Sequence, residues 1–207
     1  VDMSEADFGE EPKLALHLKA VPTKGEQVCT AYADRPACNP EESHLNVQGG
    51  VGSSYVVYVL ATNVPPGEGI KNAAFGISYG PNIVISSWQS CSETETPGGP
   101  PGITWPQSGS GTMVAWSAPG NCQFVSAPGD TGGQVMAICG ALTMIAYADD
   151  VFTLTRRNYI PSPDFQIVTC PGKIYRLDPK RAGGLIGFGT KSGRDPCKNA
   201  YFPSSRF

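Results

Sequence analysis

The segment Gly76-Ile77-Ser78-Tyr79-Gly80 matches the Gly-x-Ser-x-Gly nucleophile elbow, a motif that would supply a catalytic serine. An elbow serine lies on a strained turn between a strand and a helix, and its base is a histidine later in the chain. Here Pro81, Asn82 and another β-type run follow the serine, and both histidines, His17 and His44, precede it. We therefore predict no nucleophilic serine. The few titratable groups suited to acid–base catalysis predict no enzyme activity of another kind.

Two pairs of adjacent charged residues are the next candidates. Asp149-Asp150 resembles a carboxylate pair for glycoside hydrolysis or part of a calcium site, but adjacent strand residues point to opposite faces. We expect a solvated turn, with a weak calcium site built with loop carbonyls as the alternative. Arg156-Arg157 predicts one exposed and one packed arginine rather than an anion site. No Gly-rich phosphate loop joins a strand to a helix, so no nucleotide or other cofactor is expected.

The tryptophans are the best candidates for ligand binding. Trp88, Trp105 and Trp116 flank the Gly- and Pro-rich segment 97–102. Tryptophans exposed on a rigid β face present flat rings on which a sugar stacks. The apolar run Met113-Val114-Ala115-Trp116 favours a core position for Trp116. Trp88 and Trp105 remain as candidate glycan-stacking residues, with core packing as the alternative.

Seven cysteines are spread along the chain without Cys-x-x-Cys spacing, and with two histidines a zinc site is not expected. Loops rich in Asn, Pro and Gly flank them, which predicts disulfides made in an oxidising compartment. Cys139 lies in an apolar run and is predicted to be a buried free thiol, with an intermolecular bridge as the alternative. Six cysteines allow 15 connectivities, and spacing alone does not choose among them. Pairing neighbours along the chain gives Cys29–Cys38, Cys91–Cys122 and Cys170–Cys197.

The composition is typical of an extracellular β protein. Charged residues make up 16% of the chain, and 25 Gly and 19 Pro among 207 residues fit short strands joined by many turns. A net charge of −3 gives no basis for nucleic-acid binding, and no apolar run approaches the roughly 18 residues that span a bilayer. The chain opens Val1-Asp2-Met3 without a basic and then apolar leader. We expect a removed signal peptide and an extracellular or cell-surface location.

Alternating and β-branched runs predict an all-β fold, a two-sheet β-sandwich or jelly roll of about nine to ten strands. We expect an acidic N-terminal tail at 1–12 and a single sandwich domain at 13–207. Runs 70–79 and 83–88 predict a hairpin around Gly80-Pro81-Asn82. Run 134–148 predicts a strand, with a helix as the alternative. The other predicted strands are 14–19, 54–62, 103–105, 112–117, 151–157, 165–169, 173–177 and 185–189.

Part of the chain resembles a known family. After the first alternating strand come Pro22-Thr23-Lys24-Gly25, a Val-rich strand and then Gly69-Ile70-Lys71-Asn72-Ala73-Ala74-Phe75-Gly76-Ile77-Ser78-Tyr79, followed by Ile83-Val84-Ile85. Over residues 13–90 this order is similar to the cohesin-type modules of bacterial surface and cellulosome proteins. The resemblance implies a fold and not a partner. The predicted disulfides and the insertion at 26–53 depart from the cohesin pattern, so dockerin binding is not carried over.

Two classes of function remain. In the first, the chain is a subunit of an extracellular filament or surface assembly. Residues 1–12 carry five acids and no base, whereas 172–207 carry eight bases and two acids, so opposite ends would steer head-to-tail contacts between copies. The alternating Leu14, Leu16 and Leu18 would then complete a neighbour's sheet edge. Solvated ends are the alternative. In the second class, the chain is a cohesin-like or carbohydrate-binding module for a glycan or another surface protein.

Overall fold

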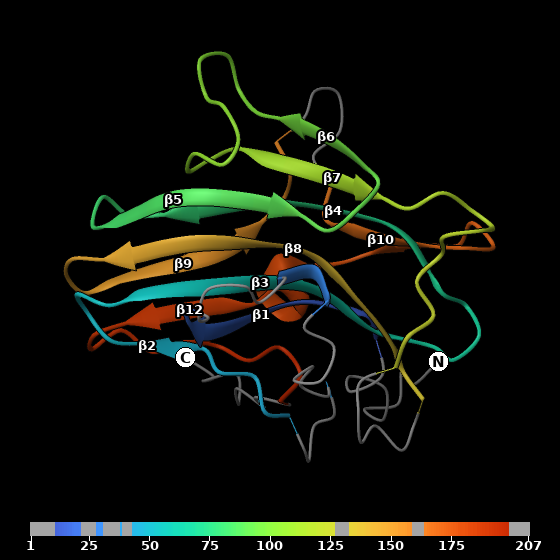
Figure 1. Cartoon of the computed structure of the whole chain (residues 1–207), viewed down its shortest axis with the longest axis horizontal. Helices are drawn as coiled ribbons and strands as arrows, with labels where there is room; N and C mark the ends of the chain where they lie inside the picture. The colour runs from blue at the N-terminus through green and yellow to red at the C-terminus, as the bar shows by residue number, and fades with distance from the viewer. Residues whose placement is uncertain are drawn as a thin grey trace, which may run out of the picture.

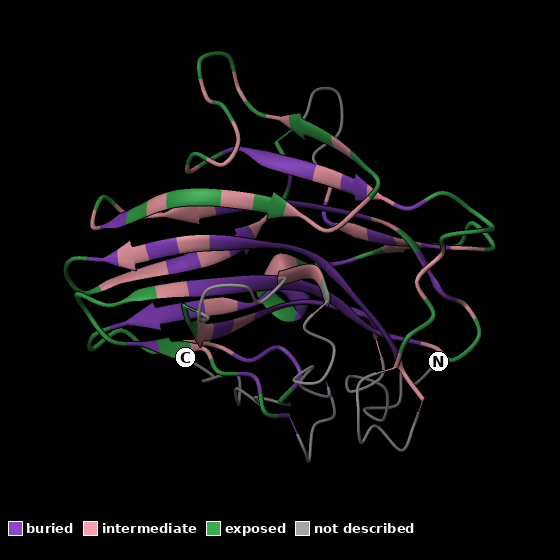
Figure 2. Cartoon of the chain, in the orientation of Figure 1, coloured by how far each residue is buried: buried purple, intermediate pink, exposed green. Residues whose placement is uncertain are grey.

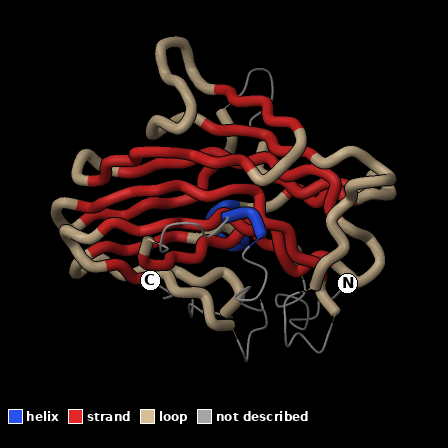
Figure 3. The backbone as a smooth tube through the Cα atoms, viewed as in Figure 1, coloured by secondary structure: helices blue, strands red, loops and turns tan. Residues whose placement is uncertain are grey.

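The computed structural model describes residues 11–21, 28–30, 38, 43–126, 133–158 and 164–198. Strands dominate this part of the chain and form two facing sheets (Figures 1 and 3). The described ranges hold twelve strands, a 3-10 turn and one short helix, α1 (Pro179–Ala182), which the Asp178 side chain caps. The prediction of an all-β, two-sheet sandwich is confirmed, with more strands than the nine to ten expected.

Sheet A has four antiparallel strands in the order β1-β3-β8-β5. Residues 134–148 had allowed a strand or a helix, and the strand is found. Gly140 lies in the middle of this strand, where a Cβ would overlap the Trp88 ring of the neighbouring strand. Glycine there disfavours a helix and lets the tryptophan lie against the backbone. The strands of sheet A are β1 (Lys13–Ala20), β3 (Ser54–Val64), β8 (Val135–Ala146) and β5 (Ile83–Ser90).

Sheet B has eight strands, six of them in the order β11-β10-β4-β9-β12-β2. Strand β7 also pairs with β4, and β6 pairs with β7. All of these pairs are antiparallel except β12 with β2. The strands of sheet B are β2 (Gln48–Gly49), β4 (Ile70–Tyr79), β6 (Thr94–Gly98), β7 (Gly111–Ala115), β9 (Asp150–Thr155), β10 (Gln166–Thr169), β11 (Ile174–Arg176) and β12 (Leu185–Phe188).

Two local predictions are wrong. Strands β4 and β5 form no hairpin, because β4 pairs with β7, β9 and β10 in sheet B while β5 pairs with β8 in sheet A. The turn at 80–82 carries the chain between the sheets, and the Asp150 carboxylate accepts the Asn82 amide there at 3.0 Å. The strand predicted at 103–105 is also not found. These residues form turns, closed by hydrogen bonds from Ile103 N to Pro100 O and from Gln107 N to Thr104 O.

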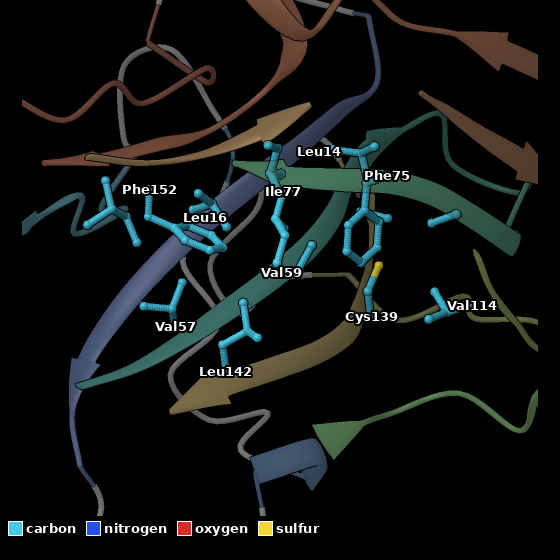
Figure 4. Packing of buried hydrophobic residues seen from close by; sticks show 14 of the residues in the cluster. Leu14, Leu16, Val57, Val59, Phe75, Ile77, Val114, Cys139, Leu142 and Phe152 are labelled. Atoms are coloured by element: carbon cyan, nitrogen blue, oxygen red, sulfur yellow. The ribbon is translucent and has the colours of Figure 1, made fainter. Parts of the chain in front are cut away.

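The space between the sheets is filled by apolar side chains from both sides (Figure 4). Leu14 and Leu16 of β1 meet Phe75 and Ile77 of β4, and all four are inaccessible to solvent. Strand side chains alternate between faces, so Phe75 and Ile77 share the inner face of β4. Tyr79, at the end of the same face of β4, is partly buried.

The central part of sheet A is buried on its other face as well. A second apolar cluster packs there beneath the segments that hold Leu45, Cys38 and Cys197. It uses the alternate side chains of β3 and β8, so it forms a third layer of the sandwich. Figure 2 shows the central strands of sheet A largely in purple. A strand buried on both faces is apolar throughout, which explains the unbroken run in β8. The cluster includes Ala15, Val56, Tyr58, Leu60, Met136, Ile138 and Ala141.

The predicted pairing of neighbouring cysteines is wrong. Instead of Cys29–Cys38, Cys91–Cys122 and Cys170–Cys197, the fold joins cysteines 62, 159 and 48 residues apart. A disulfide requires Cα atoms about 4.4–6.8 Å apart, and only the tertiary fold decides which cysteines come that close. Cys139 is buried in β8 as a free thiol. The disulfides are Cys29–Cys91, Cys38–Cys197 and Cys122–Cys170, with Cα separations of 5.3, 5.0 and 6.1 Å.

Candidate functional site

The outer face of sheet B carries an open hollow of about 680 Å³. Because Ile77 and Leu154 turn into the core, the alternate residues Ser78, Thr153 and Thr155 turn outward from β4 and β9. The hollow thus lies on the outer face of sheet B, and its floor is a row of hydroxyl groups.

Cationic side chains surround this floor, and we call the whole feature the cationic hollow. Arg156 follows β9, Lys180 lies in α1 and Arg194 follows β12, so three separate segments bring positive charge together. The carboxylate in the lining, Asp178, accepts the Lys180 amide at 3.1 Å as the cap of α1. Positive charge thus exceeds negative charge, and guanidinium groups suit carboxylate or similar anionic ligands. The other lining residues are Ile77, Gly109, Leu154, Asn158, Pro179 and Leu185.

Arg194 is fixed in place by the backbone. Its Nη2 donates to the carbonyls of Pro179 at 3.0 Å and Gly183 at 2.8 Å, and its own amide donates to Leu185 O at 2.7 Å. Burial lowers the pKa of the Arg194 guanidinium, and the nearby Asp178 carboxylate partly offsets this effect. Arginine nevertheless stays protonated in proteins, so Arg194 supplies a held positive charge at one side of the hollow.

The adjacent arginines separate, as the sequence predicted. Arg156 is exposed and lines the hollow, whereas Arg157 is buried and its Nη2 donates to Thr96 O of β6 at 3.0 Å. Gly111 makes room for Arg157, because a Cβ at residue 111 would lie 2.9 Å from its Cγ. Arg157 therefore ties β6 to the end of β9 and leaves Arg156 to face solvent.

Ser78 lies on the floor of the hollow but has none of the surroundings of a nucleophile. It sits within β4, opposite Thr153 of β9, and a turn and then β5 follow it where an elbow requires a helix. His17 lies on β1 of sheet A, where its Nδ1 accepts the Asn46 amide at 3.1 Å. The Gly-x-Ser-x-Gly pattern is thus part of an alternating strand.

Trp88 and Trp105 form no flat platform for a sugar. Their rings are nearly perpendicular, at 87° with centroids 5.1 Å apart, and both meet Phe75 edge-on. The indole N–H of Trp88 donates to Glu95 Oε1 at 2.8 Å. Both rings are partly buried because they extend the core between β5 and the loop before β7. The prediction of glycan stacking on this pair is therefore wrong. Trp116 is buried, as expected.

The proposed assembly strand is also wrong. Leu14, Leu16 and Leu18 are buried in the core of their own chain, and β1 pairs with β3 along its whole length. The other edge of β1 is covered too, since Gly184 N donates to Leu14 O and Leu18 N donates to Asn46 O, both at 2.8 Å. Alternation shows that one face of a strand is buried but not which molecule buries it. Strand donation by these leucines is excluded.

The two adjacent aspartates serve different turns. Asp150 accepts the amides of Asn82 at 3.0 Å and Val151 at 2.8 Å. Asp149 accepts the Thr190 hydroxyl, and this hydrogen bond lowers the pKa of Asp149. The described residues contain no group of three His, Cys, Asp or Glu side chains arranged to hold a metal ion. The pair thus does not converge on one ligand.

No protein-family model and no curated protein matches the chain. Among solved structures, it is similar to a cohesin module of a Clostridium perfringens family 33 glycoside hydrolase, with 9% identity over 86% of this chain and 98% of that one, and a TM-score of 0.45. The seventh ScaB type I cohesin of Pseudobacteroides cellulosolvens shares 14% identity over 70% of this chain and 88% of its own, with a TM-score of 0.40.

The C-terminal fragment of the major pilin GBS80 of Streptococcus agalactiae is also similar, with 10% identity over 86% of this chain and 56% of that fragment, and a TM-score of 0.33. Cohesin modules, which the segment 69–79 resembles in sequence, thus stand among the similar solved structures. At these low identities and TM-scores, nothing about binding or activity follows from the likeness. No helix within the described ranges is long and apolar enough to cross a membrane.

Proposed function

We propose that this chain is a secreted, non-enzymatic structural protein whose copies associate head to tail, with the acidic segment 2–11 of one copy on the cationic hollow of the next. The observation that supports the proposal is the gathering of Arg156, Lys180 and Arg194 on the outer face of sheet B. Residues 1–10 lie outside the described part of the chain, so their contribution rests on sequence. The proposal treats 1–12 as an acidic segment and 13–207 as one sandwich.

Complementary charge supports this pairing. Segment 2–11 holds five carboxylates without a base, and the hollow holds three cations and one carboxylate. Exposed ion pairs contribute up to about 1 kcal/mol each, so a few of them give weak, salt-dependent association. With strand donation by β1 excluded, the proposed contact rests on charge. Repeated head to tail, such a contact builds an open chain unless its rotation closes into a ring.

The disulfides support secretion. Three disulfides in a chain of this size are typical of proteins that fold in an oxidising compartment. The low charged fraction of 16% agrees with an extracellular β protein. We therefore place the assembly outside the cell or at its surface.

A synthetic peptide of residues 1–12 tests the contact, titrated into the full chain and followed by calorimetry. The variant Arg156→Gln/Lys180→Gln should weaken peptide binding about tenfold, because two exposed pairs are lost. Lys71→Gln/Arg176→Gln is the matched control, since it removes one exposed lysine and one exposed arginine outside the hollow. The control should bind as the unchanged chain does, and electron microscopy should show chains only when the hollow is intact. Equal binding by both variants would contradict the proposal.

A second candidate is a recognition module that binds an acidic segment of another surface protein in the same hollow. The same excess of cations supports it. A pool of unrelated acidic peptides, each with five carboxylates, separates the two. Tighter binding of an unrelated peptide than of residues 1–12 favours recognition of another protein over self-assembly.

A further inference from the structure

Strand β5 leaves an eight-residue edge of sheet A without a partner strand. Within the part of the chain that the structure describes, β5 pairs only with β8. The other outer strands are protected: β1 is covered by Gly184 and Asn46, β6 contains Pro97, β2 has two residues, and the short β11 ends at Arg176. Short length, proline, charge, β-bulges and covering segments are the usual means of preventing edge pairing. Among the described residues, β5 carries a bulge, but it is eight residues long and has no proline, no charge and no covering strand.

The backbone of β5 offers hydrogen-bonding groups along this edge. At the two ends of the β5–β8 ladder, Tyr147 N donates to Asn82 O at 2.9 Å and Cys91 N donates to Cys139 O at 3.0 Å. Antiparallel ladders alternate between inward and outward groups, so the amides of Ile85 and Trp88 point away from β8. Beyond that ladder, no backbone hydrogen bond to residues 84–89 is found among the described residues. A register shift between Ile85 and Ser87 marks a bulge in the middle of this edge.

The side chains of β5 also suit pairing. Its sequence, Ile-Val-Ile-Ser-Ser-Trp-Gln-Ser, has neither charge nor proline. Val84 is 48% exposed, and Ser86, Ser87 and Gln89 are exposed as well, which Figure 2 shows as green and pink along the strand. A neutral strand opposite a copy of itself meets no like charge, whereas a charged partner strand would find no opposite charge there.

We infer that the edge of β5 pairs antiparallel with the β5 edge of a second copy. The two four-stranded sheets would then form one continuous sheet across a two-fold axis, because an antiparallel contact of a strand with itself is isologous and closed. This contact is independent of the proposed head-to-tail association, which uses sheet B and charge. If the β5 contact and the head-to-tail contact both form, two head-to-tail filaments are joined side by side.

The test is sedimentation velocity on the full chain in about 500 mM NaCl, where charge-driven association is screened. The edge variant Val84→Lys/Ser87→Lys places two lysines on the free edge. Its matched control is Val51→Lys/Ser54→Lys, which changes the same residue types at exposed positions. Ser54 of β3 and Val84 of β5 both pair with Ile145 of β8, so they lie in one cross-strand row. Ser54, however, is on an inner strand of the sheet, two strands away from the free edge. The unchanged chain and the control should form dimers, and the edge variant should dimerise at least tenfold more weakly.

Amide hydrogen exchange gives a second readout that a merely unfolded variant would not mimic. In the unchanged chain, the Ile85 and Trp88 amides should exchange severalfold more slowly, up to about tenfold, at about 300 µM than at about 3 µM, following dimer occupancy. The hollow variant Arg156→Gln/Lys180→Gln should keep this dimer, so the failure of either proposal is recognised separately. A monomer at 300 µM, equal dimerisation by edge variant and control, or exchange independent of concentration each overturns the inference.

Discussion

The buried thiol of Cys139 makes alkaline pH a probe of the core. Cys139 lies in the middle of β8, and Figure 4 shows its sulfur beside the ring of Phe75. Burial raises the pKa of Cys139 from 9.0 to about 12, and a hydrogen bond with the Ala61 backbone offsets only part of this effect. The folded protein therefore keeps a proton that the unfolded chain releases at lower pH.

The effect on stability follows from that difference. Above pH 9 the unfolded state binds fewer protons than the folded state, so the free energy of unfolding falls as pH rises. The stabilisation is complete below pH 9 and is lost as pH rises toward 12. Each pH unit in this window corresponds to about 1.4 kcal/mol. Between pH 7.5 and 10.5 the thiol alone should cost roughly 2 kcal/mol.

The assay is urea unfolding of the unchanged chain and of Cys139→Ala at both pH values, without reductant. Alanine does not titrate, so the unchanged chain should lose roughly 2 kcal/mol more stability than the variant between the two pH values. Tyrosine and lysine ionisation is common to both proteins and cancels in the comparison. Peptide mapping after each experiment verifies that the three disulfides have not exchanged. An equal loss in both proteins would refute burial of the thiol.

Three further predictions concern packing. Leu16→Ala should lower the free energy of unfolding by about 2–5 kcal/mol in urea titrations without changing the oligomeric state, because Leu16 belongs to its own core. Gly140→Ala should destabilise by about 1–3 kcal/mol in the same assay, since its methyl group overlaps the Trp88 ring. Removing Cys38–Cys197 by double serine substitution should cost about 2–5 kcal/mol and increase the binding of a hydrophobic dye, as the third layer loosens. Unchanged dye binding would contradict the assignment of this layer.

Local sequence patterns predicted most of the strands but not their partners. They missed β2 and β6, and they placed a strand at 103–105, where turns are found. The alternation in β1 and the β-branched residues of β3 and β4 reflect burial of one or both faces, which a short window of sequence records. The hairpin at 80–82 and the cysteine pairs failed for a common reason. Both depend on which segments meet in space, and a turn such as Gly80-Pro81-Asn82 fits a hairpin or a crossing between sheets equally well.

The candidate site was less predictable than the fold. Arg156, Lys180 and Arg194 come from three segments, and no spacing in the sequence links them. The sequence did contain one indication of a cationic site, which is the excess of basic over acidic residues in 172–207. The tryptophans drew attention because of their type, but packing against Phe75 turned Trp88 and Trp105 edge to face. Surface chemistry of this kind is decided by side-chain direction, which composition does not record.

The third layer on sheet A also sets an order of events during folding. Cys38 bonds to Cys197, which is made 159 residues later. Until Cys197 is made, the second apolar face of β3 and β8 lacks part of its cover, and Cys38 has no native partner. An incomplete chain therefore presents both bare β surface and a reactive thiol, the two features that lead to aggregation and mispairing. The yield of native protein should therefore rise when chaperones and disulfide catalysts act on the chain before Cys38 pairs with Cys197.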